Sequence, residues 1–383
     1  MIKITINPAD RCFMKGNEPF FYLADTAWCA FQHISADEFR RYARKRAEQG
    51  FTAVQISALP LSFNTGDWHP FEKVGDSYDY SRINTDYFDH ATELLKIALE
   101  AGLMPCIHLL WVEYVPDTWG CSRPIPEEYL EPILSYMIER FAPYTPFFSV
   151  SGDTRFETSR VVRYYKTALD LIKAIAPDAL TTLHINPECF PPRELTDHPA
   201  YSFASYQSGH GDGDWLSKID GFSEAFGRKL PGYPLVNTEP CYEDIGHYLN
   251  KSLRFKAADI RHAAWRSILG GASAGIAYGA HGVWQCRLPE YPMFGEETWG
   301  KSADIFSALE FPGASSICEM KRIFTSERLW GLKPSECCQE YISAVSEYAG
   351  KARTVTYYPD ITGVHIPEGA KLYRFGKDAL VIH

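Results

Sequence analysis

Several patterns that mark other classes of protein are missing from this chain of 383 residues. No apolar run reaches the roughly 18 residues that a transmembrane helix requires. The N-terminal segment, residues 1–7, has no apolar stretch long enough to act as a signal peptide. We therefore expect no membrane-spanning segment, and we expect a cytoplasmic protein.

Patterns that bind metals or phosphorylated cofactors are missing as well. The ten cysteines are scattered, include no C-x-x-C pair and show no spacing typical of a zinc site. Because cysteines such as Cys106 and Cys318 lie inside apolar segments, we expect buried free thiols in a reducing compartment rather than a disulfide framework. No glycine-rich phosphate loop is present. We therefore expect no cofactor and no metal.

Positive charge is scarce relative to negative charge. Lys and Arg number 38 against 48 Asp and Glu, which gives a formal net charge of −10. Nucleic acids and anionic membranes attract basic surfaces, so this balance disfavours both as partners.

What the sequence does contain is a regular alternation of short apolar segments and helical patterns. A helix is predicted, for example, from the capping-box sequence Ser35–Glu38 to Gly50. Eight strand–helix alternations predict an α/β fold of the (β/α)8 TIM-barrel type. The eight predicted strands are residues 20–25, 51–57, 103–111, 147–150, 180–185, 201–206, 234–239 and 275–278.

The pattern of predicted secondary structure changes near the C-terminus. We expect the catalytic barrel to occupy residues 1–335, with residues 1–18 as an N-terminal β edge. Residues 336–383 contain short strand-like runs separated by Gly, Pro and Asp, which predicts a small antiparallel β appendage. Segments this short rarely fold alone, so we expect the appendage to pack on the barrel, with residues 2–7 as a candidate strand partner.

Two of the predicted strands deliver a carboxylate at their carboxyl ends. Glu239 ends the run Pro234–Glu239 and is followed at once by Pro240, and Asp153 follows the run Phe147–Gly152. The carboxyl ends of barrel strands share one face, where active sites form. Two carboxyl groups in different environments are the minimum for hydrolysing a glycosidic bond, because one delivers a proton and the other stays ionised. Asp153 and Glu239 are therefore the candidate catalytic residues.

Polar and aromatic side chains are predicted at the same face. Aromatic residues make up 14% of the chain, and indole faces cover the C–H faces of sugar rings, whereas carboxylates, amides and imidazoles bind hydroxyls. Structural roles compete with this interpretation, because an Asp can cap a turn, a His can bond within a barrel layer and a Trp can belong to the core. The candidate substrate-binding residues are Asp25, Trp28, Trp68, His108, Trp111, His184, Tyr206, His281, Trp284 and Gln285.

Several linked motifs carry a resemblance to a known family. They lie at residues 19–28, 46–55, 151–153, 237–243 and 277–285. Together they resemble the apiosidase-like glycoside hydrolases of family 140, within the DUF-type "4038" barrels, over roughly residues 15–335. The resemblance implies a retaining (β/α)8 glycosidase with Asp153 as acid and base and Glu239 as nucleophile. It further implies that a terminal sugar is cleaved from plant-type oligosaccharides by double displacement.

Two alternatives remain open at this stage. The first is a non-catalytic carbohydrate-binding barrel, which would need aromatics and amides but no pair of strand-end carboxylates. The second is a metal-assisted hydrolase, for which an H-x-H on the first strand would be supporting evidence; that pattern is missing. The residues that this second alternative would use are Asp25, His108, Asp153 and His184.

Overall fold

A barrel of parallel strands forms the body of the protein. The computed structural model describes residues 3–63, 66, 68–75, 77–211, 215–291 and 295–383. The barrel strands are β4 (Tyr22–Thr26), β5 (Ala53–Ser57), β8 (Met104–Trp111), β9 (Phe147–Gly152), β10 (Leu180–Thr182), β11 (Ala204–Gln207), β12 (Leu235–Glu239) and β13 (Gly275–Tyr278).

These strands follow the order β10-β9-β8-β5-β4-β13-β12-β11 in one eight-stranded sheet. The two end strands also approach each other, because the Ser202 amide donates to the Thr181 carbonyl over 2.8 Å. The Thr182 hydroxyl likewise donates to the Phe203 carbonyl over 2.8 Å. The sheet is thus nearly closed, and the predicted (β/α)8 barrel is confirmed.

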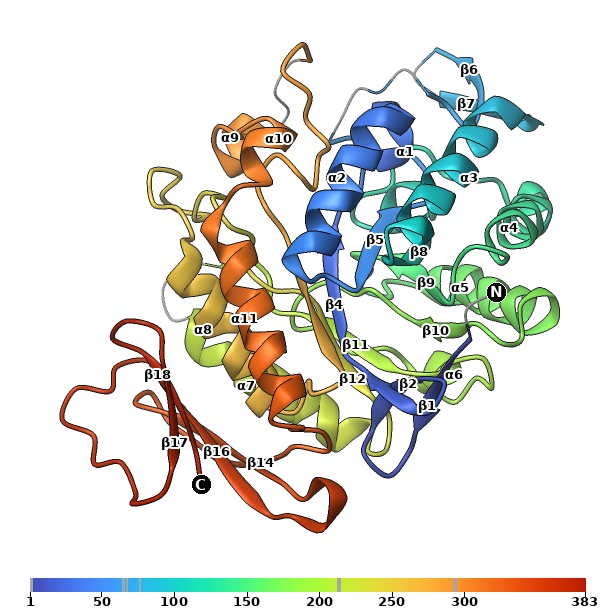
Figure 1. The fold of residues 1–383 in the computed structure, drawn as a ribbon. Coiled ribbons are helices and arrows are strands. Elements are labelled where there is room, and N and C mark those ends of the chain that lie inside the picture. Colours follow the sequence, from blue (N-terminus) through green and yellow to red (C-terminus); the bar gives the residue numbers. More distant parts are fainter. Residues whose placement is uncertain (1–2, 64–65, 67, 76, 212–214, 292–294) are drawn as a thin grey trace.

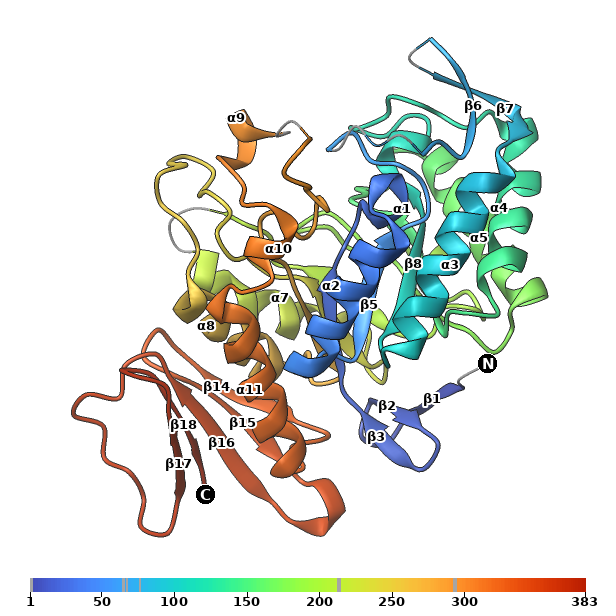
Figure 2. The same cartoon turned by 45° about the horizontal axis from the view of Figure 1, so that its top comes forward.

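Helices cover the outside of the barrel between successive strands (Figures 1 and 2). The first long helix shows why they form where they do. The Ser35 hydroxyl accepts from the Glu38 amide in a capping box, and Gly50, at φ 112°, ends the helix in a left-handed conformation. The outer helices are α2 (Ala36–Gln49), α3 (Thr85–Glu100), α4 (Glu127–Phe141), α5 (Ser159–Ile175), α6 (Arg193–Thr196), α7 (Trp215–Lys229), α8 (Ala257–Leu269) and α11 (Pro312–Ser326).

The loops that follow the carboxyl ends of the strands are long and carry short elements of their own. They form the top of the molecule in Figure 1. These elements are α1 (Ala30–His33), the hairpin β6 (Phe71–Val74) and β7 (Ser77–Ile83), η1 (Val112–Tyr114), α9 (Glu296–Trp299) and α10 (Ile305–Ala308). Within the described residues, no helix is long and apolar enough to cross a membrane.

A small antiparallel sheet lies at the opposite end of the barrel. It consists of β1 (Ile4–Asn7), β2 (Cys12–Lys15) and β3 (Glu18–Phe20). Phe13 of this sheet packs edge-on against Phe147 and Phe203 of the barrel interior, with ring centroids 5.3 and 5.1 Å apart. The N-terminal segment therefore covers the amino-terminal end of the barrel with aromatic side chains.

A second antiparallel sheet ends the chain. Its strands are β14 (Lys333–Cys337), β15 (Ile342–Ser346), β16 (Arg353–Tyr358), β17 (Lys371–Arg374) and β18 (Ala379–Ile382), in the order β14-β15-β16-β18-β17, with the short helix η2 (Tyr348–Gly350) between β15 and β16. The predicted appendage is confirmed, but its suggested pairing with residues 2–7 is wrong because β1 pairs with β2.

This C-terminal sheet packs on the outer helices, away from the carboxyl ends of the barrel strands (Figure 2). Arg261 of α8 forms a two-pronged ion pair with Asp378, at 2.6 and 2.8 Å. Trp265 of α8 stacks on Tyr357 of β16 at 6.3 Å.

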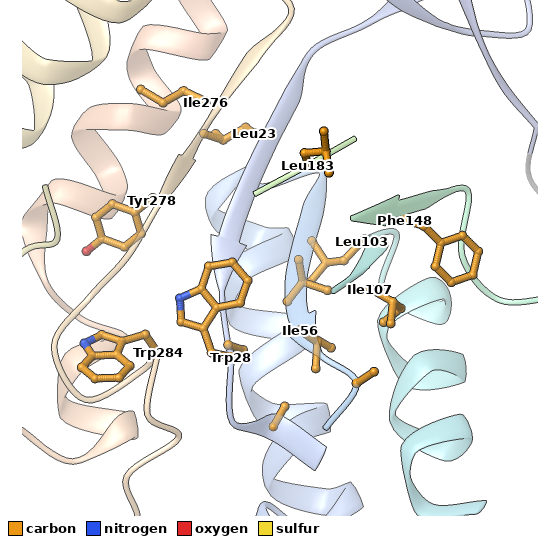
Figure 3. Close-up of a cluster of buried hydrophobic side chains, with 14 of the residues drawn as sticks. Leu23, Trp28, Ile56, Leu103, Ile107, Phe148, Leu183, Ile276, Tyr278 and Trp284 are labelled. Atoms are coloured by element: carbon orange, nitrogen blue, oxygen red, sulfur yellow. The ribbon is translucent and has the colours of Figure 1, made fainter. Parts of the chain in front are cut away.

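The hydrophobic core has two layers because strand side chains alternate between the two faces of the barrel wall. Tyr22 and Ala24 of β4 belong to the cluster inside the barrel, whereas Leu23 belongs to the cluster between the strands and the helices. Figure 3 shows part of the cluster to which Leu23 belongs, with Leu23 beside Ile276 and with Trp28 and Trp284, which line a cavity, in the same cluster. The same alternation decides which polar side chains reach the interior.

Candidate active site

A cavity of about 480 Å³ lies at the carboxyl ends of the strands. Two carboxylates, two amides and a histidine contribute polar groups, and the walls are largely aromatic. A cavity of this size and character is typical of a site for a small ligand. Its described lining residues are Trp28, Phe63, Trp111, Trp119, Asp153, Asn186, Pro187, Gln207, Gly209, His210, Gly211, Glu239, Tyr242, Ile245, Tyr248, Trp284, Gly295, Thr298 and Trp299.

Asp153 stands directly after β9 in a strained conformation. Its φ of 53° lies in the left-handed region, which is uncommon for a residue other than glycine and tends to occur at functional sites. Gly152 before it is required because a Cβ there would lie 2.2 Å from Cε3 of Trp111. Gln207 donates to Oδ1 of Asp153 over 2.6 Å, and the Trp119 indole donates to its backbone carbonyl over 2.8 Å. The carboxylate is thus held in place at the cavity.

Glu239 ends β12 and lines the same cavity. Nε2 of His210 lies 3.0 Å from its Oε1, and Nδ1 of His210 accepts from the Tyr242 amide. His210 is therefore the tautomer that donates from Nε2 to Glu239. Burial alone would raise the pKa of Glu239, but hydrogen bonds from His184 and His210 outweigh burial and lower it. Glu239 is consequently held as an ionised carboxylate.

His184 lies between the two carboxylates and is fully buried. Its Nε2 is 3.5 Å from Oδ1 of Asp153 and 3.3 Å from Oε2 of Glu239. One donor atom from each of the three residues lies within 4.8 Å of the others, which is close enough to surround a proton or a cation. Burial would lower the pKa of His184, but the hydrogen bonds and charges of the two carboxylates raise it to about 9.

The predicted binding residues divide into three groups. Trp28, Trp111 and Trp284 line the cavity. His108 and His184 are fully buried beneath them and do not line it. Their rings lie 5.2 Å apart and edge-on, with Trp28 4.7 Å from His108. The two histidines therefore lie beneath the cavity, and their expected contact with substrate stays a prediction.

Five further predicted binding residues lie away from the cavity. Asp25 and Tyr206 point outward from their strands, Asp25 to Arg46 of α2 and Tyr206 to Phe226 of α7. Strand alternation sends the neighbouring side chains inward instead, as Gln207 illustrates. The remaining residues of this group are Trp68, His281 and Gln285.

The side chains of Trp68, His281 and Gln285 contact residues outside the cavity or are buried. Trp68 stacks on His90 at 4.5 Å, on the outer side of the loop after β5. His281 lies behind Trp284, stacked at 6.1 Å, and contacts Arg254. Burial lowers the pKa of His281 to about 4, so it is neutral. Gln285 is buried and is not part of the cavity wall.

Of the residues expected for a metal-assisted site, Asp25 lies apart from His108, Asp153 and His184. Asp25 forms a buried ion pair with Arg46 at 2.7 Å, on the outer face of the barrel wall. Asp153 and His184, in contrast, lie at the cavity with Glu239. Only that second group brings donor atoms together within the described part of the chain.

The sequence did not single out several residues that the fold brings to the cavity. Trp119 comes from the loop after β8, His210 from the loop after β11, Tyr242 from the loop after β12, and Trp299 from α9. The one usable signal was the run Ser208-Gly-His-Gly211 directly after a strand, because active sites form at the carboxyl ends of barrel strands.

Comparison with known proteins identifies relatives. The model of the family described as "Apiosidase-like, catalytic domain" matches residues 8–331. Among solved structures, a glycoside hydrolase family 5 protein from Bacteroides vulgatus is 20% identical, covers 99% of this chain and 93% of its own, and superposes with a TM-score of 0.80.

Another solved glycoside hydrolase is 21% identical over 93% of this chain and 83% of its own, with a TM-score of 0.74. An exo-β-1,4-mannosidase from an Opitutaceae bacterium is 14% identical over 84% and 62%, with a TM-score of 0.59. At these identities the structural similarity shows a shared fold. No curated protein matches the chain.

Proposed function

The chain belongs to the family of apiosidase-like catalytic domains, and on this premise we propose that it hydrolyses glycosidic bonds by double displacement with net retention. As a glycoside hydrolase, it acts on sugars. In the proposed reaction Glu239 is the nucleophile and Asp153 is the general acid and then the general base.

The observation that carries this proposal is the distance between the two carboxylates. An oxygen of Asp153 and an oxygen of Glu239 lie within 4.8 Å of each other. Retaining glycosidases place these groups about 5–5.5 Å apart, whereas inverting enzymes separate them by about 6.5–9.5 Å to admit a water. The short separation supports direct attack by a carboxylate.

The surroundings of each carboxylate suit its proposed role. Glu239 is ionised and receives hydrogen bonds from His210, so it is ready to attack the anomeric carbon. Asp153 faces the same cavity and protonates the leaving oxygen as that bond breaks. In the second half-reaction Asp153 removes a proton from the water that replaces Glu239 at the anomeric carbon.

The cavity walls support a carbohydrate substrate with a leaving group that has a flat apolar face. Trp28, Trp111 and Trp284 form the inner walls. Trp119 lies beyond Asp153 at the rim, 51% exposed, with Arg155 5.1 Å from its ring centroid. Because the acid stands beside the leaving group, Trp119 belongs to the leaving-group side. We assign this surface to the second sugar of an oligosaccharide.

The finer identity of the substrate follows from the resemblance to apiosidase-like enzymes: a terminal sugar removed from a plant-type oligosaccharide. The fully buried free thiols of Cys29, Cys106 and Cys241 support a reducing, cytoplasmic location. There the enzyme would act on imported oligosaccharides.

A non-catalytic binding barrel is the alternative from another class. Such a protein would need the aromatic walls and amides of the cavity. It would have no need for two carboxylates packed around a buried histidine. Bringing two negative charges together is unfavourable, and catalysis requires this arrangement whereas binding does not. The pair Asp153 and Glu239 therefore favours an enzyme.

The proposal is tested by combining a substrate screen with two variants. A panel of aryl pentosides and hexosides identifies the sugar and the anomer. Glu239→Ala is expected to be inactive on every substrate. Asp153→Ala is expected to lose about 10²–10⁴-fold in kcat/KM on the natural linkage, but far less on a dinitrophenyl glycoside, whose leaving group needs little protonation. Azide should raise the activity of Asp153→Ala by replacing the water.

Glu127→Ala on the outer face of α4 is the matched carboxylate control, and it should behave as the wild type. Natural turnover by Glu239→Ala, or Asp153→Ala losing the same factor on both substrates without azide rescue, would contradict the assignment.

A further inference from the structure

The position of His184 raises a question of protonation. The side chain is fully buried, and its backbone is fixed on both sides because Ser149 accepts from its amide and Ser151 donates to its carbonyl. Its Nε2 faces Asp153 and Glu239 at 3.5 and 3.3 Å, so both carboxylates compete for a hydrogen on that nitrogen.

The other ring nitrogen decides the tautomer. Nδ1 of His184 lies 3.1 Å from the hydroxyl oxygen of Thr238. That hydroxyl donates its own hydrogen to the backbone carbonyl of Tyr206 over 3.1 Å, so towards His184 it can only accept. Nδ1 therefore carries a hydrogen. An unprotonated Nε2 would then direct its lone pair at two carboxylates, which is repulsive.

We propose that His184 carries a hydrogen on both ring nitrogens in the resting enzyme and shares the Nε2 proton with Asp153 and Glu239 as the proton store of the catalytic pair. This proposal rests on the proposed glycosidase function. His184 is a positioning residue in this account, because it is buried under the cavity and does not reach the substrate.

The groups that face His184 from each neighbouring element agree with one shared proton. Asp153 and Glu239 are its acidic neighbours, at the ends of β9 and β12. His108 of β8 stays neutral, because burial and the charge on His184 both lower its pKa far below the usual value. His210, from the loop after β11, places its Nε2 3.0 Å from Oε1 of Glu239, and its Nδ1 accepts from the Tyr242 amide.

The rings that enclose His184 also favour a cation. The indoles of Trp28 and Trp111 each have their centroids 5.5 Å from the imidazole centroid. Aromatic rings attract a cation at distances below about 6 Å. Two acids, two indoles and a hydroxyl acceptor therefore surround the imidazolium. Burial lowers the pKa of His184, but the hydrogen bonds and charges of the two acids raise it to about 9.

The shared proton gives the reaction a balanced sequence. In the first step the proton passes from Nε2 of His184 to Asp153 and on to the leaving oxygen, while the glycosidic bond breaks and Glu239 forms an ester with the anomeric carbon. In the second step water adds to that carbon and the ester bond breaks. The water's proton passes to Asp153 and returns to His184, which restores the resting state.

The test follows the pH dependence of three variants. His184→Gln keeps an amide donor near both carboxylates but cannot carry the proton. Thr238→Val removes the acceptor for Nδ1 with little change of shape, and Thr238→Ser is the matched control that keeps it. kcat/KM is measured against pH on a methyl glycoside, which needs protonation, and on a dinitrophenyl glycoside of the same sugar, which does not.

We expect the basic limb of the methyl glycoside profile to move down by about one pH unit or more in His184→Gln and Thr238→Val, and to stay in place in Thr238→Ser. At basic pH, the fold-loss of kcat/KM in His184→Gln should be greater for the methyl glycoside than for the dinitrophenyl glycoside, by a factor of about ten or more. If His184→Gln does not fold, comparing the basic limbs of Thr238→Val and Thr238→Ser tests the proposal instead.

An unmoved basic limb, or equal shifts in Thr238→Val and Thr238→Ser, would overturn the proposal. So would the same loss on both substrates at every pH, which is the mark of a structural role, or loss of wild-type activity in EDTA that zinc restores. Azide rescue of Asp153→Ala together with an unmoved limb would refute only the role of His184. Failure of that rescue would refute the glycosidase assignment itself.

Discussion

The buried ion pair between Asp25 and Arg46 separates a structural from a functional interpretation of the first strand. Both side chains are fully buried, with Nε of Arg46 2.7 Å from Oδ2 of Asp25. The Tyr42 hydroxyl donates to the same oxygen over 2.9 Å. Asp25→Ala leaves the Arg46 guanidinium buried without its counter-charge, and breaking a buried pair in this way costs about 3–5 kcal/mol. That is a large part of the total stability of a typical domain, about 5–15 kcal/mol.

The assay is urea denaturation followed by tryptophan fluorescence, with kcat/KM measured on the folded protein. Asp37→Ala is the matched control: Asp37 pairs with Arg40 on the same helix but its side chain is 94% exposed, so the loss should be at most about 1 kcal/mol. Replacing both partners, as Asp25→Leu with Arg46→Met, should recover most of the stability because no charge is left unpaired. Normal stability of Asp25→Ala with a raised KM would refute this reasoning and return Asp25 to the substrate site.

Three further outcomes are expected. Trp119→Ala should raise KM for an oligosaccharide at least several-fold, with little change in KM for a glycosyl fluoride, because fluoride is too small to reach Trp119 at the rim of the cavity. Equal changes in KM for both substrates would contradict the leaving-group assignment. Activity should survive dialysis against EDTA, and a loss that zinc or magnesium restores would favour the metal-assisted alternative. The stability of the wild type should fall as pH rises from 6.5 through about 9, because the pKa of His184 is raised in the folded state and its stabilisation is complete only below the unfolded value of 6.5. At about 1.4 kcal/mol per pH unit the fall amounts to about 3 kcal/mol, and His184→Gln should flatten it in denaturation curves.

The sequence was sufficient for the architecture because the fold depends on a repeated signal. Eight apolar segments separated by helical patterns predict a barrel even where single boundaries are uncertain. The placement of Asp153 and Glu239 at one cavity was also predictable, whereas their catalytic roles stay a prediction. Glu239 stands before Pro240 and Asp153 after Gly152, and both positions interrupt a strand in a way that a purely structural acid does not require.

The direction of side chains was not predictable in the same way. A shift of one position along a strand moves a side chain from the interior to the outer face, and the boundaries of short strands are uncertain by more than that. The sequence therefore predicts that Asp25 and Tyr206 face the cavity, whereas in the structure they face α2 and α7. Trp119 and His210 stand in irregular loops, where sequence periodicity carries no information about position.

The role of His184 depends on contacts that only the folded chain contains. Asp153 approaches it from the end of β9, whereas Thr238 and Glu239 approach it from β12, and the direction of the Thr238 hydrogen bond determines its protonation. A lone histidine at a strand end gives none of this information.

The central claim, attack by Glu239 with retention of configuration, is tested most directly by the stereochemistry of the first product. Proton NMR recorded during the first minutes of hydrolysis of an aryl glycoside distinguishes the anomer released by the enzyme from the anomer formed later by mutarotation. Because one oxygen of Asp153 and one oxygen of Glu239 lie within 4.8 Å of each other, the account predicts that the first anomer keeps the configuration of the substrate. A first product of the opposite configuration would contradict it.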